Sequence, residues 1–195
     1  MLRVELSHGR GELGTLERAQ IVRPFPRVLG DLGRMGAGFA ALELVRELLP
    51  EREVDPAPLE LTLELLDRLD RAAAPSARLL VCFEARLLAL CGFAPQLLAC
   101  GLCGRTPGES QAAEFDPHSG HLVCRQCGGA SHRLAGPVRA ALQLSSGPDW
   151  SAAAQVPWAP QAVGEAHAAL RVFAEHRIGK ALEADSLLQT ALRDA

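Results

Sequence analysis

The chain has 195 residues, enough for one large domain or two small ones with a sizeable hydrophobic core. Its hydrophobic fraction of 48% excludes global disorder, and the formal net charge of −3 does not by itself indicate a nucleic-acid partner. No apolar run approaches the roughly 20 residues of a membrane-spanning helix, and the N-terminal residues lack the apolar core of a signal peptide. The sequence therefore predicts a cytoplasmic protein.

The first segment, residues 2–22, has the pattern of two short strands around a glycine-rich turn. Gly9, Gly11 and Gly14 supply the turn. Two strands alone are marginally stable in water, so the segment is predicted to be the end of a larger β unit.

Two helices are predicted after the prolines Pro24 and Pro26. Apolar residues keep helical spacing over 29–49, and Pro50 ends the run. The next run, 55–69, begins with alternating leucines, as a strand would. Leucine and glutamate favour helix, however, and the alternation breaks near the end of the run, so a helix is predicted.

The third predicted helix is capped by Ser76 and ended by Gly92. Beyond the cysteine-rich region the sequence predicts mostly helix, which makes the fold class mainly α. The expected elements there are a short helix after Pro137, a loop over 145–160, a helix that carries Val163 and ends at Gly179, and further helix over 182–192.

Six cysteines in a cytoplasmic chain are more readily explained by metal binding than by disulfides. Four of them form two Cys-x-x-Cys pairs, Cys100 with Cys103 and Cys124 with Cys127, separated by twenty residues. Each pair places two thiolates on one tight turn, and a glycine directly after each pair relieves crowding there. Four sulfur ligands in tetrahedral geometry predict one structural zinc ion, with iron in a rubredoxin-like site as the alternative.

Redox chemistry and catalysis are the other interpretations of the cysteine pairs. A redox dithiol normally opens a helix beside a βαβ unit, which this sequence does not predict. A catalytic zinc keeps an open position, whereas four cysteines fill the coordination shell, so His118 and His121 are expected at the surface. Cys82 and Cys91 lie in the third predicted helix and are expected to act as small hydrophobic residues. The absence of a phosphate loop, a Ser-His-Asp set or a paired-carboxylate motif argues against an enzyme.

Two sets of basic residues are candidate contacts for a partner. Arg78 and Arg86 flank Cys82 at helical spacing, away from the helix's leucine face. They form either a solvated stripe or an edge that receives an acidic, hydrophobic peptide tail. The second set lies around and after the cysteine pairs and is either solvated or in contact with DNA phosphates. Its members are Arg105, Arg125, Arg133, Arg139, Arg177 and Lys180.

Several stretches together resemble the bacterial RecO family of recombination and repair proteins. The closest runs from Phe83 (FEARLLALCGFAPQL) into the first cysteine pair. Residues 115–124 (FDPHSGHLVC) resemble the family's hairpin before the second pair, and 176–184 (HRIGKALEA) resemble its C-terminal signature. Residues 13–16 (LGTL) and the Phe-Pro pair at 25–26 resemble the end of its β-barrel and the entry to its helices.

The resemblance implies a RecO-like helical domain over 25–195, with a zinc-binding insertion at about 98–130. Residues 1–24 would be remnant strands of an OB-fold, most of which this sequence does not contain, so DNA binding weaker than a full member's is expected. The resemblance also implies a nucleoid-associated, non-enzymatic recombination mediator that binds single- and double-stranded DNA, anneals strands and helps load the recombinase with RecR.

A further implied partner is the C-terminal tail of single-stranded DNA-binding protein (SSB), expected near Arg78 and Arg86. The alternative function is of a different class. It is a zinc-stabilised protein–protein adaptor that docks helices or acidic tails and does not itself bind DNA.

Overall fold

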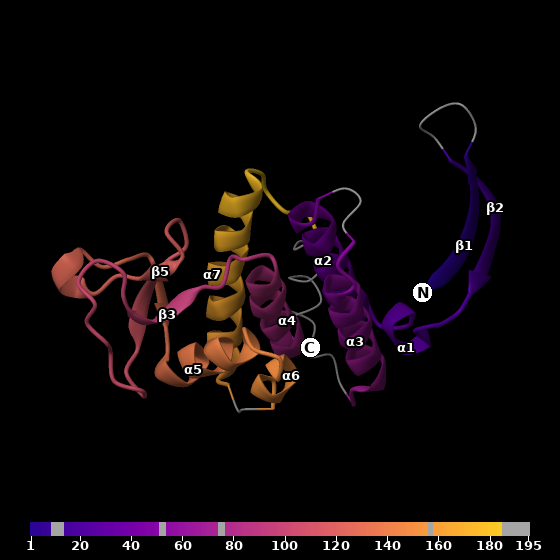
Figure 1. The fold of residues 1–195 in the computed structure, drawn as a ribbon. Helices are drawn as coiled ribbons and strands as arrows, with labels where there is room; N and C mark the ends of the chain where they lie inside the picture. The colour runs from indigo at the N-terminus through magenta and orange to yellow at the C-terminus, as the bar shows by residue number, and fades with distance from the viewer. Residues whose placement is uncertain (9–13, 51–53, 74–76, 156–157, 185–195) are drawn as a thin grey trace.

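The computed structural model describes residues 1–8, 14–50, 54–73, 77–155 and 158–184. Figure 1 shows three parts along the molecule: a β-hairpin, a bundle of helices beside it, and a small sheet with long loops beyond the bundle. The protein is mainly α, as predicted. Within the described ranges, no helix combines the length and the hydrophobicity needed to cross a membrane.

The hairpin consists of β1 (Leu2–His8) and β2 (Gly14–Ile21), which pair antiparallel as the sequence predicts. Leu2 lies opposite Ile21 and Leu6 lies opposite Leu16, so these apolar side chains share one face. All four are exposed, because the hairpin stands away from the bundle (Figure 1). Its apolar face is therefore not part of the hydrophobic core.

The helix predicted over 29–49 is confirmed as α2 (Leu32–Leu48), and a break at residues 30–31 separates it from a short preceding helix, α1 (Pro26–Leu29). The break occurs because Asp31 caps α2: its side chain accepts a hydrogen bond from the backbone N–H of Arg34 at 2.9 Å. The helix predicted over 55–69 is confirmed as α3 (Ala57–Arg71). Leucines four residues apart are buried along it, which resolves the conflict with strand-like alternation.

Helix α4 (Ala77–Leu90) is the centre of the bundle and packs against α2, α3 and the three helices that follow the sheet. Neighbours cover it on nearly every side, and Cys82 is fully buried. The stripe of Arg78, Cys82 and Arg86 therefore does not lie on an open face, contrary to the sequence prediction. Gly92 follows the helix with φ of +82°, as expected, whereas the predicted cap at Ser76 lies outside the described residues.

The small sheet has the strand order β3-β5-β4-β6. Strands β3 and β5 are parallel, and the other neighbours are antiparallel. A short 3-10 helix, η1 (Arg125–Cys127), lies between β5 and β6. The strands are β3 (Gln96–Cys100), β4 (Ala113–Asp116), β5 (His121–Leu122) and β6 (His132–Leu134).

The chain then returns to the bundle through α5 (Gly136–Ser145), α6 (Trp150–Ala153) and α7 (Pro160–Ile178). Helix α6 corrects the loop predicted over 145–160. The Trp150 side chain is 2% exposed and packs edge-on against Phe83, with ring centroids 6.4 Å apart, so burial of one large aromatic residue stabilises the short helix. Gly179 ends α7 as predicted. Residues 182–184 are not helical, and the rest of the last predicted helix lies outside the described residues.

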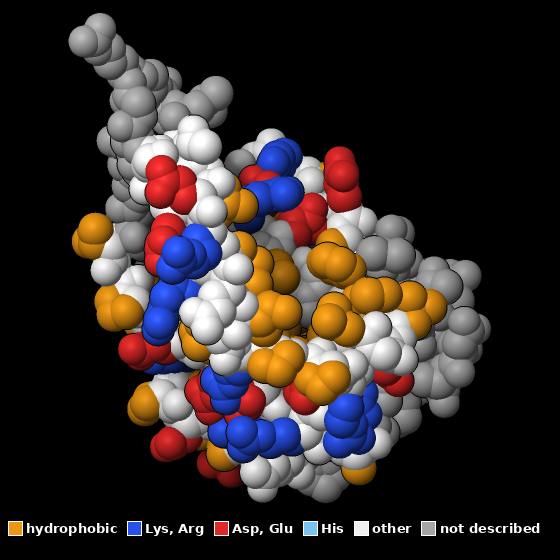
Figure 2. Space-filling model, turned by 90° about the vertical axis from the view of Figure 1, so that its right-hand side faces the viewer, with side chains coloured by type: hydrophobic (Ala, Val, Ile, Leu, Met, Phe, Trp, Pro, Cys, Tyr) orange, Lys and Arg blue, Asp and Glu red, His pale blue; other side chains and the backbone are white. Residues whose placement is uncertain are grey.

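The hairpin side of the molecule is rich in exposed hydrophobic residues. Figure 2 views this side and shows hydrophobic side chains gathered in its middle, with charged side chains around them. A contiguous apolar surface of this kind is typical of a contact surface. The exposed hydrophobic residues of the hairpin, α1 and α2 include Leu2, Val4, Leu6, Leu16, Ile21, Leu29, Leu32, Phe39 and Leu42.

Candidate metal centre and nucleic-acid contacts

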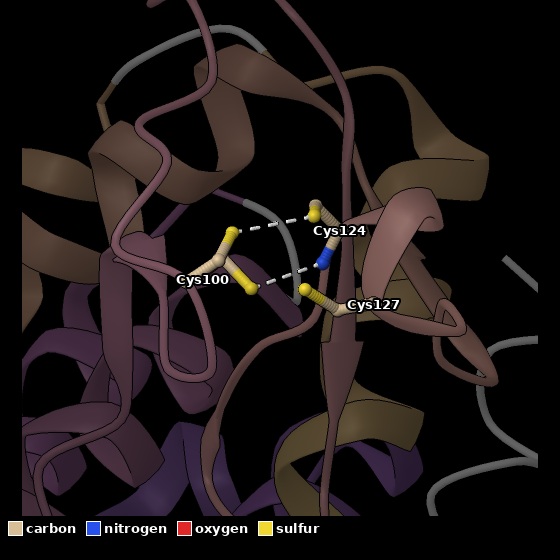
Figure 3. A group of neighbouring side chains, drawn as sticks. Cys100, Cys124 and Cys127 are labelled. Atoms are coloured by element: carbon tan, nitrogen blue, oxygen red, sulfur yellow. Dashed lines mark hydrogen bonds between the residues drawn. The ribbon is translucent and has the colours of Figure 1, made fainter.

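The four predicted metal ligands come together at one end of the small sheet. Cys100 ends β3, and Cys103 lies in the turn that follows. Cys124 precedes η1, and Cys127 is its last residue. The four Sγ atoms all lie within 4.8 Å of one another. Figure 3 shows Cys100, Cys124 and Cys127 pointing toward a common centre.

The spacing of the sulfur atoms fits a tetrahedral metal ion. The Sγ atoms of Cys103 and Cys124, one from each pair, are 3.6 Å apart. Metal–sulfur bonds of about 2.3 Å at tetrahedral angles place two sulfur ligands roughly 3.8 Å apart. The four cysteines are therefore positioned to bind a metal ion, and the two pairs contribute two ligands each.

Backbone hydrogen bonds favour the thiolate that a metal ion requires. The backbone N–H of Cys124 donates to Cys100 Sγ at 3.3 Å (Figure 3), and this bond is the main reason why the pKa of Cys100 falls to about 6. Hydrogen bonds with Cys103 and Cys124 raise the pKa of Cys127 to about 12, since the thiols share their protons. A bound cation would lower the pKa of every thiol in the cluster.

The glycine that follows each cysteine pair is explained by its backbone conformation. Gly104 and Gly128 have φ of +72° and +109°, in the left-handed region that other residues rarely adopt. A Cβ atom at either position would meet nothing within 4 Å. The prediction that these glycines relieve crowding is therefore wrong, and backbone conformation explains them instead.

The two histidines between the pairs lie outside the group of four sulfurs that the described residues form. His118 is exposed, and its ring packs edge-on against His176 with centroids 4.9 Å apart. His121 is half-buried, with its ring against Gly101. The expectation of a surface position is confirmed for His118 and only partly for His121.

Three of the predicted basic residues line one open cleft beside the cysteines. Arg105, Arg125 and Arg133 border this cleft, which has a volume of about 510 Å³ and reaches Cys100 and Cys124. The Arg125 side chain is 84% exposed, and its Nε donates to Glu114 at 3.0 Å. The backbone N–H of Ala130 and then Arg125 hold the pKa of Glu114 below its usual value. The cleft thus combines three cations with one ionised carboxylate.

Arg139 is not a surface residue, which corrects its prediction as a DNA contact. Its side chain is 4% exposed, and burial lowers the pKa of its guanidinium. Nη1 donates to the carbonyl of Leu97 at 3.0 Å, and Nη2 donates to the carbonyls of Gly108 and Gln111 at 2.8 and 3.1 Å. The guanidinium therefore ties α5 to β3 and to the loop before β4.

The other predicted basic residues lie apart from the cleft. Arg177, near the end of α7, is exposed and donates to carbonyls of the β4–β5 turn. Lys180 pairs with Glu47 of α2 at 2.7 Å and holds the pKa of that carboxyl below its usual value. Arg78 and Arg86 are half-buried, and Arg86 Nη1 donates to the carbonyl of Ser146 at the end of α5, at 2.7 Å.

Sequence reasoning missed two buried charged groups. Arg34 donates to the carbonyls of Leu69 and Ala72 at 2.7 and 3.0 Å, and so satisfies the end of α3. Glu84 of α4 pairs with His167 of α7, with Nδ1 3.0 Å from Oε1. The signal for Glu84 was its place within a strongly apolar helix, where a carboxylate needs a partner.

Fold and site together define a mainly helical protein with an inserted four-cysteine metal-binding element. Residues 29–185 match the family model for the recombination protein O C terminal. A DNA repair protein RecO from Anaeromyxobacter sp. (strain K) is 37% identical over 177 residues, which cover 89% of this chain and 68% of the relative. The RecO of Myxococcus xanthus (strain DK1622) is 34% identical over 194 residues, or 98% of this chain and 77% of the relative. The chain belongs to the RecO family.

Proposed function

We propose that the chain is a non-enzymatic mediator of DNA recombination and repair. In this role it binds single- and double-stranded DNA, anneals complementary strands and, with RecR, helps to load the recombinase onto SSB-coated DNA in the cytoplasm. The observation that carries the proposal is the family match over residues 29–185, together with relatives named as DNA repair proteins.

We propose zinc as the metal. Four thiolates form a soft, closed tetrahedral site, which suits zinc and leaves no position for a substrate. The strands of the small sheet beside the cysteines are short, so binding of the ion would supply much of the folding free energy of this element, on the order of 10 kcal/mol. Cys100, Cys103, Cys124 and Cys127 would hold the ion, whose role is structural.

The cleft beside the metal centre is the proposed contact for DNA phosphates. Arg105 lies in a loop, Arg125 in η1 and Arg133 in β6, and only the fold gathers them around one concave surface. Phosphate contacts release counterions, so affinity should fall steeply as salt is added.

The test is binding of the purified protein to a fluorescent single-stranded oligonucleotide over a range of salt concentrations. Replacing Arg105, Arg125 and Arg133 by Ala should weaken binding and reduce the slope of log affinity against log salt by about 2, since each phosphate contact contributes about 0.7. The matched control replaces the exposed Arg27, Arg46 and Arg71, which carry the same total charge and lie on α1, α2 and α3. No binding by the unmodified protein at low salt would exclude direct DNA contact.

The acidic tail of SSB is the proposed ligand of Arg78 and Arg86. Both side chains are half-buried on α4, so part of each remains accessible, and an acidic peptide would pair with these two charges. Replacing both by Ala should weaken binding of a tail peptide, measured by fluorescence anisotropy. Because Arg86 also contacts the end of α5, the variant's unfolding midpoint is the control for a general loss of structure. Unchanged peptide affinity would refute this site.

The hairpin supports one further proposal, that it belongs to an OB-fold. Its apolar face is exposed, and a two-stranded sheet is marginally stable by itself. The exposed hydrophobic surface in Figure 2 also supports the alternative function, a zinc-stabilised adaptor. An adaptor would bind a protein partner while showing no salt-dependent affinity for any oligonucleotide.

A further inference from the structure

Three segments that are distant in the sequence meet at the end of the small sheet opposite the cysteines. Phe93 follows α4, His118 and Ser119 form the β4–β5 turn, and Arg177 lies near the end of α7. The Arg177 guanidinium lies 4.8 Å from the ring centroid of the buried Phe173 and 6.0 Å from that of Phe93. A cation and an exposed aromatic ring therefore share one surface.

Hydrogen bonds and close packing between the β4–β5 turn and α7 fix the position of this surface. Arg177 Nη2 donates to the carbonyls of His118 and Ser119 at 3.3 and 3.2 Å, which fixes the guanidinium. Gly120 completes the turn with φ of +79°, and a Cβ atom there would lie 2.5 Å from the Phe173 ring. The turn can approach α7 this closely only with glycine, so its position and that of Arg177 are determined together.

Imidazole rings extend the surface. The rings of His118 and His176 are both exposed, pack edge-on and have Nδ1 atoms 3.4 Å apart. The nearby carboxylate of Asp116 accepts hydrogen bonds from the backbone N–H and hydroxyl of Ser119 and from the backbone N–H of His118. Its charge is therefore directed into the turn.

Exposed aromatic rings are rare in this protein. The chain has six phenylalanines, two tryptophans and no tyrosine, and most of those that the structure describes are in the core. Phe39 and Phe93 are the exposed exceptions among the described residues, at 48% and 38%. Phe39 lines a surface hollow together with Leu42, Glu43 and Arg46, whereas the Arg177 guanidinium lies 6.0 Å from the ring centroid of Phe93. Of these two exposed rings, Phe93 is the one with a guanidinium placed against its π-face; the half-buried Phe25 has Arg23 at 5.7 Å from its ring centroid.

We infer that Phe93, Arg177 and the His118–His176 pair form a platform on which an unpaired base of single-stranded DNA stacks. Aromatic rings and guanidinium planes stack with any base, and the arginine also attracts the backbone phosphate. Bases in a duplex are already stacked on their neighbours, so the platform distinguishes single-stranded from double-stranded DNA. The inference rests on the proposed DNA binding and adds a site outside the arginine cleft.

The experiment compares Phe93→Leu with the unmodified protein. Leucine keeps an apolar side chain and removes only the π-face, so the charge of the protein does not change. The probes are an oligo-dT strand, an abasic strand of the same length and a duplex. Phe93→Leu should weaken binding to oligo-dT about tenfold, leave binding to the abasic strand and the duplex unchanged, and keep the same salt slope. Phe93→Trp, which restores a π-face, should restore the affinity.

Phe39→Leu is the matched control, since it removes the other exposed ring and should change no affinity. Equal binding of oligo-dT by Phe93→Leu and the unmodified protein would overturn the platform and leave the proposed function intact. An equal loss on the abasic strand would also overturn it, because the effect would then be structural. Failure of the unmodified protein to bind any strand at low salt would instead overturn the proposed DNA binding, and the platform with it.

Discussion

Arg139 offers the sharpest test of the structure, because sequence and structure assign it opposite roles. As a surface residue it would contact DNA, and its loss would leave stability unchanged. In the structure it is buried, and it donates three hydrogen bonds to backbone carbonyls. We expect Arg139→Leu to lower the free energy of unfolding and to leave the DNA affinity of the folded protein close to normal.

The magnitude follows from the three acceptors. Leu97 is 1% exposed, so water cannot replace the donor to its carbonyl, and an unsatisfied buried acceptor costs about 1–3 kcal/mol. Gly108 and Gln111 are exposed, so water can satisfy their carbonyls at a smaller cost. A leucine also avoids the desolvation of a guanidinium, which offsets part of the loss. The net destabilisation should therefore stay within about 1–3 kcal/mol.

Urea unfolding of the metal-loaded protein, followed by tryptophan fluorescence, measures this difference. Trp150 is suited to the purpose because α6 packs against α5, the helix that carries Arg139. The control is Arg133→Leu, which removes the same charge from an exposed position and should change stability by less than about 0.5 kcal/mol. Equal stability of the two variants, or a loss of DNA affinity in Arg139→Leu without any loss of stability, would refute the structural role.

Three further predictions concern the small sheet. Removing the metal with a chelator should make the four cluster thiols reactive and reduce the strand signal in circular dichroism, while the buried Cys82 stays unreactive. If the four cluster thiols were equally reactive before chelation, that result would contradict the metal site. Gly120→Ala should destabilise the protein by at least about 1 kcal/mol more than Gly92→Ala in urea unfolding. Both glycines have a left-handed backbone, but of the two only Gly120 faces an aromatic ring, that of Phe173. Equal destabilisation by the two substitutions would show that the turn does not pack on Phe173. Because the folded-state pKa of Glu114 is lowered, its stabilising contribution is present above its unfolded pKa, about 4.3, and is lost as pH falls through the folded value. Thermal melts should therefore show that Glu114→Gln costs stability at neutral pH and that the difference shrinks in acid, whereas a constant difference would argue against an ionic role.

Local patterns predicted the elements with strong periodicity or a clear stop signal. The helix that ends at Gly92 and the one that ends at Gly179 were predicted because a left-handed glycine ends a helix through its own backbone. Elements that depend on a distant partner were not predicted. Helix α6 forms because Trp150 packs against Phe83, and nothing in residues 145–160 indicates that contact.

The roles of the basic residues could not be predicted from local sequence either. Arginines at 105, 133 and 139 were all predicted to contact DNA. Only the fold places the first two at a cleft and directs the third inward to the carbonyl of Leu97. Long, flexible side chains can reach either solvent or a buried acceptor, so their role depends on tertiary contacts and not on residue type.

The sequence by itself determined the metal-binding cysteines, because sulfur ligands at short, fixed spacing leave one geometry for the turn that carries them. It also determined the family, through the stretches on either side of the cysteine pairs. Tertiary structure alone decided which charged and aromatic side chains share a surface. Phe93, His118 and Arg177 are brought together only when the small sheet packs on α7. That contact joins residues more than fifty positions apart, a distance over which local propensity carries no information.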